Sequence, residues 1–577
     1  MAEAGARTAL APARRSAPGP RTDVGVPVRV IRLLAPPLVL VALALALFPS
    51  GGSDDSYITY GAARVLARTG EIRSYNGEVL EQSSSLLHTV VLAAGARSTG
   101  LSVPLLGHVV APVAGMVAVA ATVALARQVR PASALLAGLL TATSAYLAFW
   151  TFGGLETTLA TAALVVTTLG CARVAAGGAS RAQWLLAGGG ILATVLVRPE
   201  TGLLLTAALG AAAVLAGGAG PRSRSSAADP TGAGTTGAAR RLVLLVAGAA
   251  AACAALALLR WAVFGSPFPN PVAAKSGGLG SSDGASYVAT WWLSRFHLPL
   301  LVAAVAGAAV SLVRARTAAG ALVCTMLGAV VGFVLLSGGD WMQGGRFLAP
   351  AAPFVAVLAA AAVTALPARR WRSVVGATLL VVQLLAVVDL AATRSTATPL
   401  WAGSTFDVAP AVSERFAWYD LHNRVHRRNA ALLVAAEPTF ERLVGAGPPV
   451  TVSGVQAGFT LYHLFGEHGR GLRFVDRHNL VSDDFGRCDD LLEPSLRGLG
   501  RHITYDVWSR NVERCGVPMP DVVIEYGSIE DHPALVGRYT TVAQVQPATN
   551  RAVGRLPGVD VGTEQFVAVR DGLLPST

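Results

Sequence analysis

Charged residues are scarce in this chain. Only 14% of its 577 residues are Asp, Glu, Lys or Arg, whereas a soluble globular protein carries about 25%. Hydrophobic residues make up 53% of the sequence, and the mean hydropathy is +0.52. The shortage of charge and the long apolar runs exclude an ordinary soluble protein and predict a polytopic α-helical membrane protein.

Cysteine is also rare, with five residues in the whole chain. Cys171, Cys253 and Cys324 fall in apolar runs, where free cysteines usually serve as packing residues. Cys488 and Cys515 fall in a polar C-terminal region, and they could form a disulfide if that region lies outside the cytoplasm. No Cys/His spacing resembles a zinc site.

The sequence has no aromatic-rich basic patch that would favour nucleic-acid binding. Its net charge is +12, but most clustered arginines flank apolar runs. The positive-inside rule predicts this pattern for loops that stay in the cytoplasm. We therefore interpret the basic character as a signal of membrane topology.

The apolar runs predict eleven membrane spans. They lie at 31–49, 103–126, 132–150, 157–172, 182–197, 201–217, 242–263, 297–313, 318–337, 347–366 and 373–392. Residues 1–28, rich in Ala, Pro and Arg, should form a disordered cytoplasmic tail, and residues 218–240 a flexible cytoplasmic loop. The short apolar run Leu86–Ala96 has about half the length that a span needs, so we expect a helix at the membrane surface.

Keeping 86–96 outside makes every predicted inner loop basic. The arginines of these loops are Arg127, Arg130, Arg173, Arg181, Arg222, Arg224, Arg240, Arg241, Arg314, Arg316, Arg369, Arg370 and Arg372. The N-terminus is then cytoplasmic, and the loop 49–102 lies on the outer face of the plasma membrane. Residues 29–392 form the membrane domain. Residues 393–577, where charges, turn signals and short β-type runs return, should form an extracytoplasmic α/β domain.

Two adjacent carboxylates, Asp54 and Asp55, directly follow the first predicted span. A charge at the membrane boundary that faces water or a protein cavity is a functional-site hypothesis. The same topology brings further polar motifs to the outer face: Gly153–Glu156, Arg198–Glu200, Pro269–Gly277 and Gly338–Phe347. We predict an outer cavity lined by Asp54, Asp55, Glu156, Arg198, Glu200, Lys275, Asp340 and Arg346.

Structural roles remain open for these residues at this point. Arg198 and Glu200 could form an ion pair at a helix end, and Glu156 could be a first-turn residue favoured by the helix dipole. Lys275 could be a solvated loop residue. The role of the glycines around Asp340 could be limited to forming a tight turn. His88 and His108 lie on apolar segments, where a histidine is more often a packing residue than a ligand.

One chemistry that fits an outer cavity with carboxylates and cations is glycosyl transfer from a lipid-linked phosphate. Phosphate needs no general acid to leave when a cation offsets its charge. The acceptor hydroxyl needs a base, which Asp54 or Asp55 could supply, while Lys275, Arg198 or Arg346 holds the phosphate. A divalent cation at Asp54 or Asp55 is left open, and so is a transporter or flippase that uses the same cavity. Inverted repeats would favour the transporter interpretation, and the sequence does not show them.

The order of these motifs resembles a known family. A first outer loop with DDSYIT is followed by GLE, RPE, PNPVAAK and GGDWMQGGRF. In the C-terminal part, FVDRHNLV (Phe474–Val481) and PDVVI (Pro520–Ile524) follow. The set is similar to GT-C fold glycosyltransferases of the AftB-like arabinofuranosyltransferase family. Asn479 stands where the family pattern has glycine.

The resemblance implies a multi-pass enzyme that takes arabinofuranose from decaprenyl-phosphoryl-arabinofuranose. The acceptor would be an arabinan of the cell envelope, in arabinogalactan or lipoarabinomannan. It implies Asp54 and Asp55 as catalytic residues, and net retention of configuration, which also allows a carboxylate nucleophile. Substrate-binding candidates in the matching motifs and loops are Tyr57, Glu81, Asn270 and Asp476, beside those of the predicted cavity. Another polyprenyl-phosphate sugar, for example mannose, is the alternative.

Overall fold

The structure is a computed structural model of the whole chain. It describes residues 26–48, 52–217, 233–275, 283–293, 296–315, 317–340, 342, 344–392, 418–445, 447–454, 456–482, 484–485, 488, 491, 503–545 and 565–574. The predicted N-terminal tail up to residue 25 and the loop at 218–232 lie outside this set. α10 begins at Ala233, so the last residues of the predicted 218–240 loop are helical.

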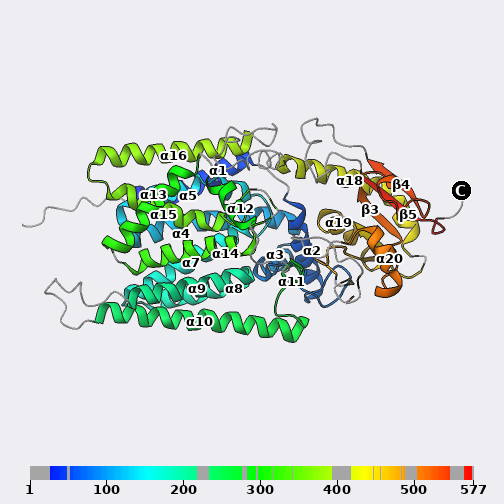
Figure 1. Cartoon of the computed structure of the whole chain (residues 1–577), viewed down its shortest axis with the longest axis horizontal. Coiled ribbons are helices and arrows are strands. Elements are labelled where there is room, and N and C mark those ends of the chain that lie inside the picture. The colour runs from blue at the N-terminus through cyan, green and yellow to red at the C-terminus, as the bar shows by residue number, and fades with distance from the viewer. Residues whose placement is uncertain are drawn as a thin grey trace, which may run out of the picture.

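A bundle of long apolar helices forms one end of the molecule (Figure 1). Its helices are α1 (Val26–Leu47), α4 (Val103–Val129), η1 (Pro131–Ser133), α5 (Ala134–Ala142), α6 (Ala145–Trp150), α7 (Thr157–Ala176), α8 (Arg181–Val197), α9 (Pro199–Gly217), α10 (Ala233–Phe264), α13 (Leu298–Ala309), η3 (Val310–Ala315), α14 (Ala318–Ser337), η4 (Ala349–Ala351), α15 (Ala352–Ala365) and α16 (Arg369–Ala392). Side chains at their starts define several of them. Thr317 caps α14, and Ser180 forms a capping box with Gln183 at α8.

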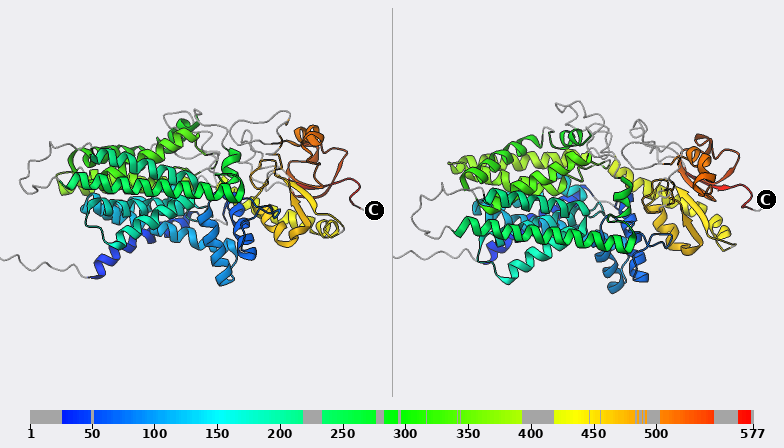
Figure 2. Two further views of the ribbon diagram at one scale, coloured as in Figure 1. Left: turned by 90° about the horizontal axis from the view of Figure 1, so that it is seen from below. Right: turned by 60° about the horizontal axis from the view of Figure 1, so that its bottom comes forward.

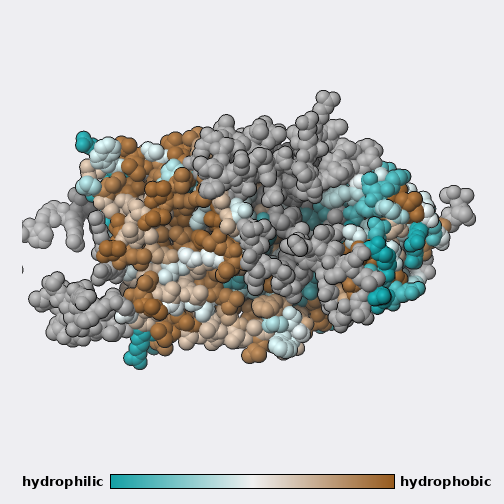
Figure 3. Space-filling view, viewed as in Figure 1, coloured by the Kyte–Doolittle hydropathy of each residue, from teal (hydrophilic) through white to brown (hydrophobic). Residues whose placement is uncertain are grey.

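Six helices in the described part of the chain are long and apolar enough to cross a membrane. They are Val103–Val129, Thr157–Ala176, Pro199–Gly217, Gly237–Phe264, Ala318–Ser337 and Arg369–Ala391. Five shorter apolar helices coincide with the remaining predicted spans: Leu33–Leu47, Pro131–Ala142, Arg181–Val197, Leu298–Val313 and Ala349–Ala365. Figure 3 shows a broad hydrophobic surface over this end of the molecule. The chain is a multi-pass membrane protein, and the count of eleven spans stays a prediction.

Two helices of the loop 49–102 lie between the bundle and the C-terminal domain (Figures 1 and 2). These are α2 (Asp54–Thr69) and α3 (Leu86–Thr99). α3 has 14 residues and is therefore about 21 Å long, which is short of the roughly 30 Å of a bilayer core. The short helices α11 (Asn270–Lys275) and α12 (Asp283–Trp292) follow α10.

The C-terminal part is an α/β domain, as predicted. Its elements are α18 (Trp418–Leu443), β1 (Val450–Gly454), α19 (Phe459–Glu467), η5 (Gly469–Gly471), β2 (Leu472–Phe474), α20 (Tyr505–Cys515), β3 (Val522–Tyr526), η6 (Ile529–Asp531), β4 (Tyr539–Val545) and β5 (Gln565–Arg570). The strand order is β2-β1-β3-β5-β4, with β2, β1 and β3 parallel and the other pairs antiparallel. β3 and β5 are buried along almost their whole length, which is why their sequences are rich in Val and Ile rather than alternating with polar residues.

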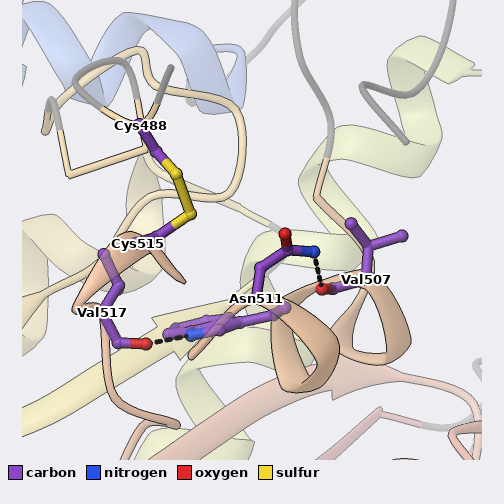
Figure 4. Close-up of a disulfide and its surroundings, with 6 residues drawn as sticks. Cys488, Val507, Asn511, Cys515 and Val517 are labelled. Carbon is purple, nitrogen blue, oxygen red and sulfur yellow. Dashed lines mark hydrogen bonds between the residues drawn. A yellow bond between two sulfur atoms is a disulfide. The ribbon is translucent and has the colours of Figure 1, made fainter. Parts of the chain in front are cut away.

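Cys488 and Cys515 form a disulfide in this domain (Figure 4). Cys515 ends α20, and the indole of Trp508 on the same helix donates to the Val517 carbonyl at 2.9 Å. The bond joins α20 to the irregular segment after β2. The sequence left this pairing open, and the structure confirms it.

Candidate active site

The paired carboxylates open helix α2. Ser53 is the N-cap residue, and its backbone N–H donates to the carbonyl of Gly153 at 3.0 Å. Carboxylates in the first helical turn are stabilised by the positive end of the helix dipole. Asp54 and Asp55 have different surroundings, because Asp54 is buried with 8% of its surface exposed and Asp55 is only half-buried.

Asp54 binds the N-terminus of a helix in the C-terminal domain. Its two carboxylate oxygens accept from the backbone N–H groups of Gly458 (3.1 Å) and Phe459 (2.9 Å), which begin α19. Burial raises the pKa of Asp54 to about 7. The negative charge of the neighbouring Asp55 also raises this pKa, whereas the two hydrogen bonds from Gly458 and Phe459 lower it. Both oxygens of Asp54 are therefore used in a contact between the two parts of the molecule.

Asp55 is the more available carboxylate of the pair. Across the described residues, no hydrogen bond or ion pair engages its side chain. It is half-buried and still reachable from solvent. The structure thus separates two residues that the sequence could not distinguish.

Tyr57 packs in an aromatic cluster between α2 and α19. Its ring lies 5.0 Å from Phe459, 5.5 Å from Tyr462 and 5.1 Å from Tyr60, each edge to face. This geometry is the favourable one for aromatic pairs, so Tyr57 helps to join the helices. Its predicted role in substrate binding stays a prediction.

The segment Gly153–Glu156 links α2 to a buried charged cluster. Glu156 precedes α7 and accepts from Nη1 of Arg198 at 2.8 Å. Arg198 also pairs through Nε with Glu200, at the start of α9. The pair that the sequence offered as a structural alternative is therefore present, and it includes Glu156 as well.

A second ion pair lies beside the first. Nε of Arg346 is 2.6 Å from Oδ2 of Asp340, and both guanidiniums lie about 5.1 Å from the ring of Phe347. The loop that carries Arg346 is fixed by α6, because the Trp150 indole donates to the Gly344 carbonyl at 2.9 Å. Gly344 has φ 75° and lies against Phe149, where a Cβ would come within 2.5 Å of the ring. Glycine is required there.

A pocket opens at this cluster. It is lined by Thr157, Ala160, Leu164, Arg198, Glu200, Thr201, Leu204, Val330, Phe333, Arg346, Phe347 and Pro350. The lining combines three charged side chains and two threonines with apolar side chains of α7, α9, α14 and the segment that carries Phe347 and Pro350. Its cavity volume is about 30 Å³, which is room for about two water molecules. A larger ligand would have to widen it.

Glu81 has a partner that the sequence analysis missed. Its two oxygens receive Nε and Nη2 of Arg260 at 2.7 and 2.9 Å, and both side chains are buried. Arg260 lies inside a predicted span, and a charge in such a run signals a buried partner. The geometry gives Glu81 a structural role, and its predicted role in substrate binding is not tested by it.

Asn270 and Asp476 meet at the contact with the C-terminal domain. The Asn270 amide donates to the carbonyls of Asn479 (2.7 Å) and Leu480 (3.0 Å). Asp476 organises the same turn by accepting from the N–H groups of His478, Leu480 and Val481. Asn479 has φ 54°, a left-handed conformation that asparagine tolerates better than most residues. This backbone conformation explains how asparagine can stand where the motif it resembles has glycine.

The predictions for Lys275, His88 and a metal ion concern residues outside the two charged clusters. The backbone of Lys275 ends α11, and its side chain lies outside the described set. His88 is buried, and burial lowers its pKa to about 4, as expected for a neutral packing histidine. In the described part of the chain, the group of three side chains with metal-ligand geometry is Glu437, Glu467 and His468, far along the chain from Asp54.

Comparisons with known proteins give similar folds. No protein-family model and no curated protein sequence matches the chain. Two crystal structures of ArnT from Cupriavidus metallidurans each match 96% of this chain. The structure bound to undecaprenyl phosphate is matched over its whole length, with a TM-score of 0.52 and 14% sequence identity. The apo structure is matched over 99% of its length, with a TM-score of 0.53 and 15% identity. The oligosaccharyltransferase AglB from Archaeoglobus fulgidus, in complex with an inhibitory peptide and a dolichol-phosphate, matches 86% (0.50, 12%, 70% of that chain). Since ArnT and AglB are GT-C glycosyltransferases, this chain has the GT-C fold.

Proposed function

We propose that the protein is a membrane glycosyltransferase that moves a sugar from a polyprenyl-phosphate donor to a cell-envelope glycan on the outer face of the membrane. The observation that carries the proposal is the chemistry of the pocket lining. Two guanidiniums, Arg198 and Arg346, line the pocket together with Glu200, two threonines and apolar side chains of three membrane helices. This arrangement suits a ligand with a phosphate head and a hydrocarbon tail.

The fold supports the same ligand class. ArnT, which matches almost the whole chain, binds undecaprenyl phosphate, and AglB binds a dolichol-phosphate. Arg is the side chain best suited to bidentate contacts with phosphate. In the resting cluster, however, Arg198 and Arg346 face three carboxylates, Glu156, Glu200 and Asp340. A phosphate therefore needs a further cation, and we assign that role to Lys275, the single lysine of the sequence.

Asp55 is our candidate for the general base. In the proposed reaction, the acceptor hydroxyl gives its proton to the Asp55 carboxylate while its oxygen bonds to the anomeric carbon. The bond from that carbon to the phosphate oxygen breaks, and its electron pair stays on the phosphate, where the arginines and Lys275 stabilise the charge. If the product retains the donor's anomeric configuration, Asp55 acts instead as a nucleophile in two displacements.

The test is transfer by the purified full chain in lipid nanodiscs. Polyprenyl phosphates that carry different radiolabelled sugars are offered with a short arabinan acceptor. Asp55→Asn should lower the rate by at least about a hundredfold at unchanged donor affinity. Glu71→Gln is the matched control, because Glu71 is an exposed carboxylate of the same loop that only pairs with Arg73. Full activity of Asp55→Asn would refute the assignment.

The finer proposal is that the sugar is arabinofuranose and that the acceptor is an arabinan. It rests on the motif order DDSYIT, GLE, RPE, PNPVAAK, GGDWMQGGRF, FVDRHNLV and PDVVI. Turnover of the arabinofuranosyl donor alone in the donor panel would support it. Preference for a mannosyl donor would replace it with the alternative sugar, and movement of intact donor across a proteoliposome membrane without transfer would replace it with a flippase.

A further inference from the structure

Helix α19 of the C-terminal domain begins directly against α2. A Cβ on Gly458 would lie 2.0 Å from the carbonyl oxygen of Asp54 and 2.6 Å from its Oδ2, so only glycine allows this approach. The carboxylate of Asp54 occupies the position of a capping side chain for α19, although Asp54 lies 404 positions before Gly458 and 405 before Phe459 in the chain. Carboxylates at a helix N-terminus bind its free N–H groups and its positive dipole end.

The two helices also meet at their other ends. Arg64, on α2, lies with its guanidinium 4.0 Å from the Tyr462 ring, and a Cβ on Gly466 would be 2.6 Å from its Nη1. α2 therefore places an anion at the N-terminus of α19 and a cation near its C-terminal turn. Both charges complement the dipole of α19, which fixes its position along α2.

α19 lies in the connection between two parallel strands, and this position shows which edge of the sheet faces α2. α19 follows β1 and leads to β2 on one side of β1, whereas the chain then returns through α20 to β3 on the other side. In open α/β sheets, ligands bind at this switch point, outside the carboxyl ends of the parallel strands. Here the first turn of α2 lies at that edge of the sheet, so the C-terminal domain contacts the same turn that carries Asp55.

A second contact of this kind is neutral. The Asn76 side chain donates to the Phe474 carbonyl at 2.8 Å and accepts from the Phe474 N–H at 2.7 Å, as a neighbouring strand would. β2 is an edge strand, so its outer backbone groups are free for this pairing. The loop 49–102 thus holds the C-terminal domain by contacts to the backbone at two separate points.

We infer that Asp54 is a positioning residue, which holds α19 and the C-terminal domain against the first turn of α2 and leaves Asp55 as the carboxylate for chemistry. This inference rests on the proposed function. It predicts that residue 54 needs a hydrogen-bond acceptor, whereas residue 55 needs a group that can take a proton or bond to the sugar. Asparagine separates the two requirements, because its amide oxygen accepts one N–H but is not a base.

The experiment compares Asn and Ala at both positions in the full chain in nanodiscs. Asp54→Asn should keep transfer within about tenfold of the wild type, and Asp54→Ala should lose about a hundredfold. Asp55→Asn and Asp55→Ala should be equally inactive. Equal inactivity of Asp54→Asn and Asp54→Ala, with α19 undisturbed, would overturn the inference and make Asp54 catalytic.

Hydrogen exchange of the peptide 458–467 gives a second readout that needs no substrate. Asp54→Ala should speed exchange at the first amides of α19 by roughly tenfold, because a lost cap frees them, and Asp54→Asn by less. Asn76→Ala, which leaves both carboxylates intact, should also lower transfer. Arg473→Ala is the control, because Arg473 is an exposed residue of β2 whose guanidinium pairs with Asp484 and, among the described residues, with neither α2 nor α19, and it should change neither readout.

The two readouts separate failure of the inference from failure of the proposed function. If no donor is turned over by the wild type but Asp54→Ala loosens α19, the transferase proposal fails and the positioning role stands. If transfer occurs but exchange in α19 is unchanged in Asp54→Ala, the positioning role fails.

Discussion

The charged cluster at the pocket and the contact between α2 and the C-terminal domain stabilise charge in opposite ways. At the pocket, Arg198 and Arg346 are paired with carboxylates within a preformed network. At the α2 contact, Asp54 is held by backbone N–H groups and its neighbour Asp55 by no described side chain. The first region pairs its charges with one another, whereas the second leaves the Asp55 carboxylate without a partner among the described residues.

The largest effect should come from Arg198→Met. It leaves Glu156 and Glu200 buried without their counter-ion, and removal of one partner from a buried ion pair costs about 3–5 kcal/mol. We expect a lower denaturation midpoint in detergent and lost donor binding. Arg73→Met, at the pair with Glu71 in which both side chains are exposed, should change the free energy of unfolding by less than about 1 kcal/mol. Equal losses of stability in the two variants would mean that the charges of the pocket cluster are hydrated and not buried against one another.

Arg260→Met should be next, because it strands the buried Glu81 carboxylate. The double variant Arg260→Met/Glu81→Met should recover most of the lost stability, since an apolar pair of similar volume often replaces a buried ion pair at little cost. Thermal denaturation of both variants is the measurement. If the double variant is active, Glu81 has no role in substrate binding, and if it is stable but inactive, the predicted role gains support.

A smaller effect is expected at Asn479, whose left-handed backbone faces Asn270. Asn479→Gly should leave stability nearly unchanged, because glycine adopts φ 54° without strain. Asn479→Val should lose about 1–3 kcal/mol in the C-terminal domain. Hydrogen exchange of the peptides of β1, β3 and β5 at increasing denaturant concentration would measure both, because it reports on the C-terminal domain separately from the membrane helices. Tolerance of valine would show that the turn can rearrange without Asn270.

A further effect, which shows only when the pH is varied, is expected at Asp54. Its pKa is raised in the folded protein to about 7, so the folded state binds an extra proton between about pH 4 and 7. This contribution to stability is complete below pH 4 and is lost as the pH rises through 7. The wild type should therefore lose stability relative to Asp54→Asn as the pH rises over this window. A constant difference would show that the two amide hydrogen bonds keep Asp54 ionised throughout.

Much of the fold follows from the sequence because hydrophobicity and arginine placement are local signals. The helices α4, α7, α9, α10, α14 and α16 each fall on a predicted span, and the sheet falls in the predicted α/β domain. Cys488 and Cys515 were recognised as a possible pair from their compartment alone. These inferences need no knowledge of which distant residues meet.

The partners of the site residues were not predictable in the same way. Glu81 and Arg260 are 179 positions apart, and the Asp54 carboxylate accepts from backbone N–H groups, which every residue except proline possesses. No residue type in the sequence marks such a donor, except that Gly458 must be small. The difference between Asp54 and Asp55 therefore emerges only when the two domains are seen together.

The contact between Asp54 and α19 also sets an order of events during biosynthesis. The two aspartates are made early, but their partner amides at 458 and 459 follow about 404 positions later. At a synthesis rate of 5–20 residues per second, this interval lasts about 20–80 s. Throughout that time the nascent chain lacks the partner of Asp54, and under the proposed function a partly made protein should therefore be inactive on the lipid pool around it.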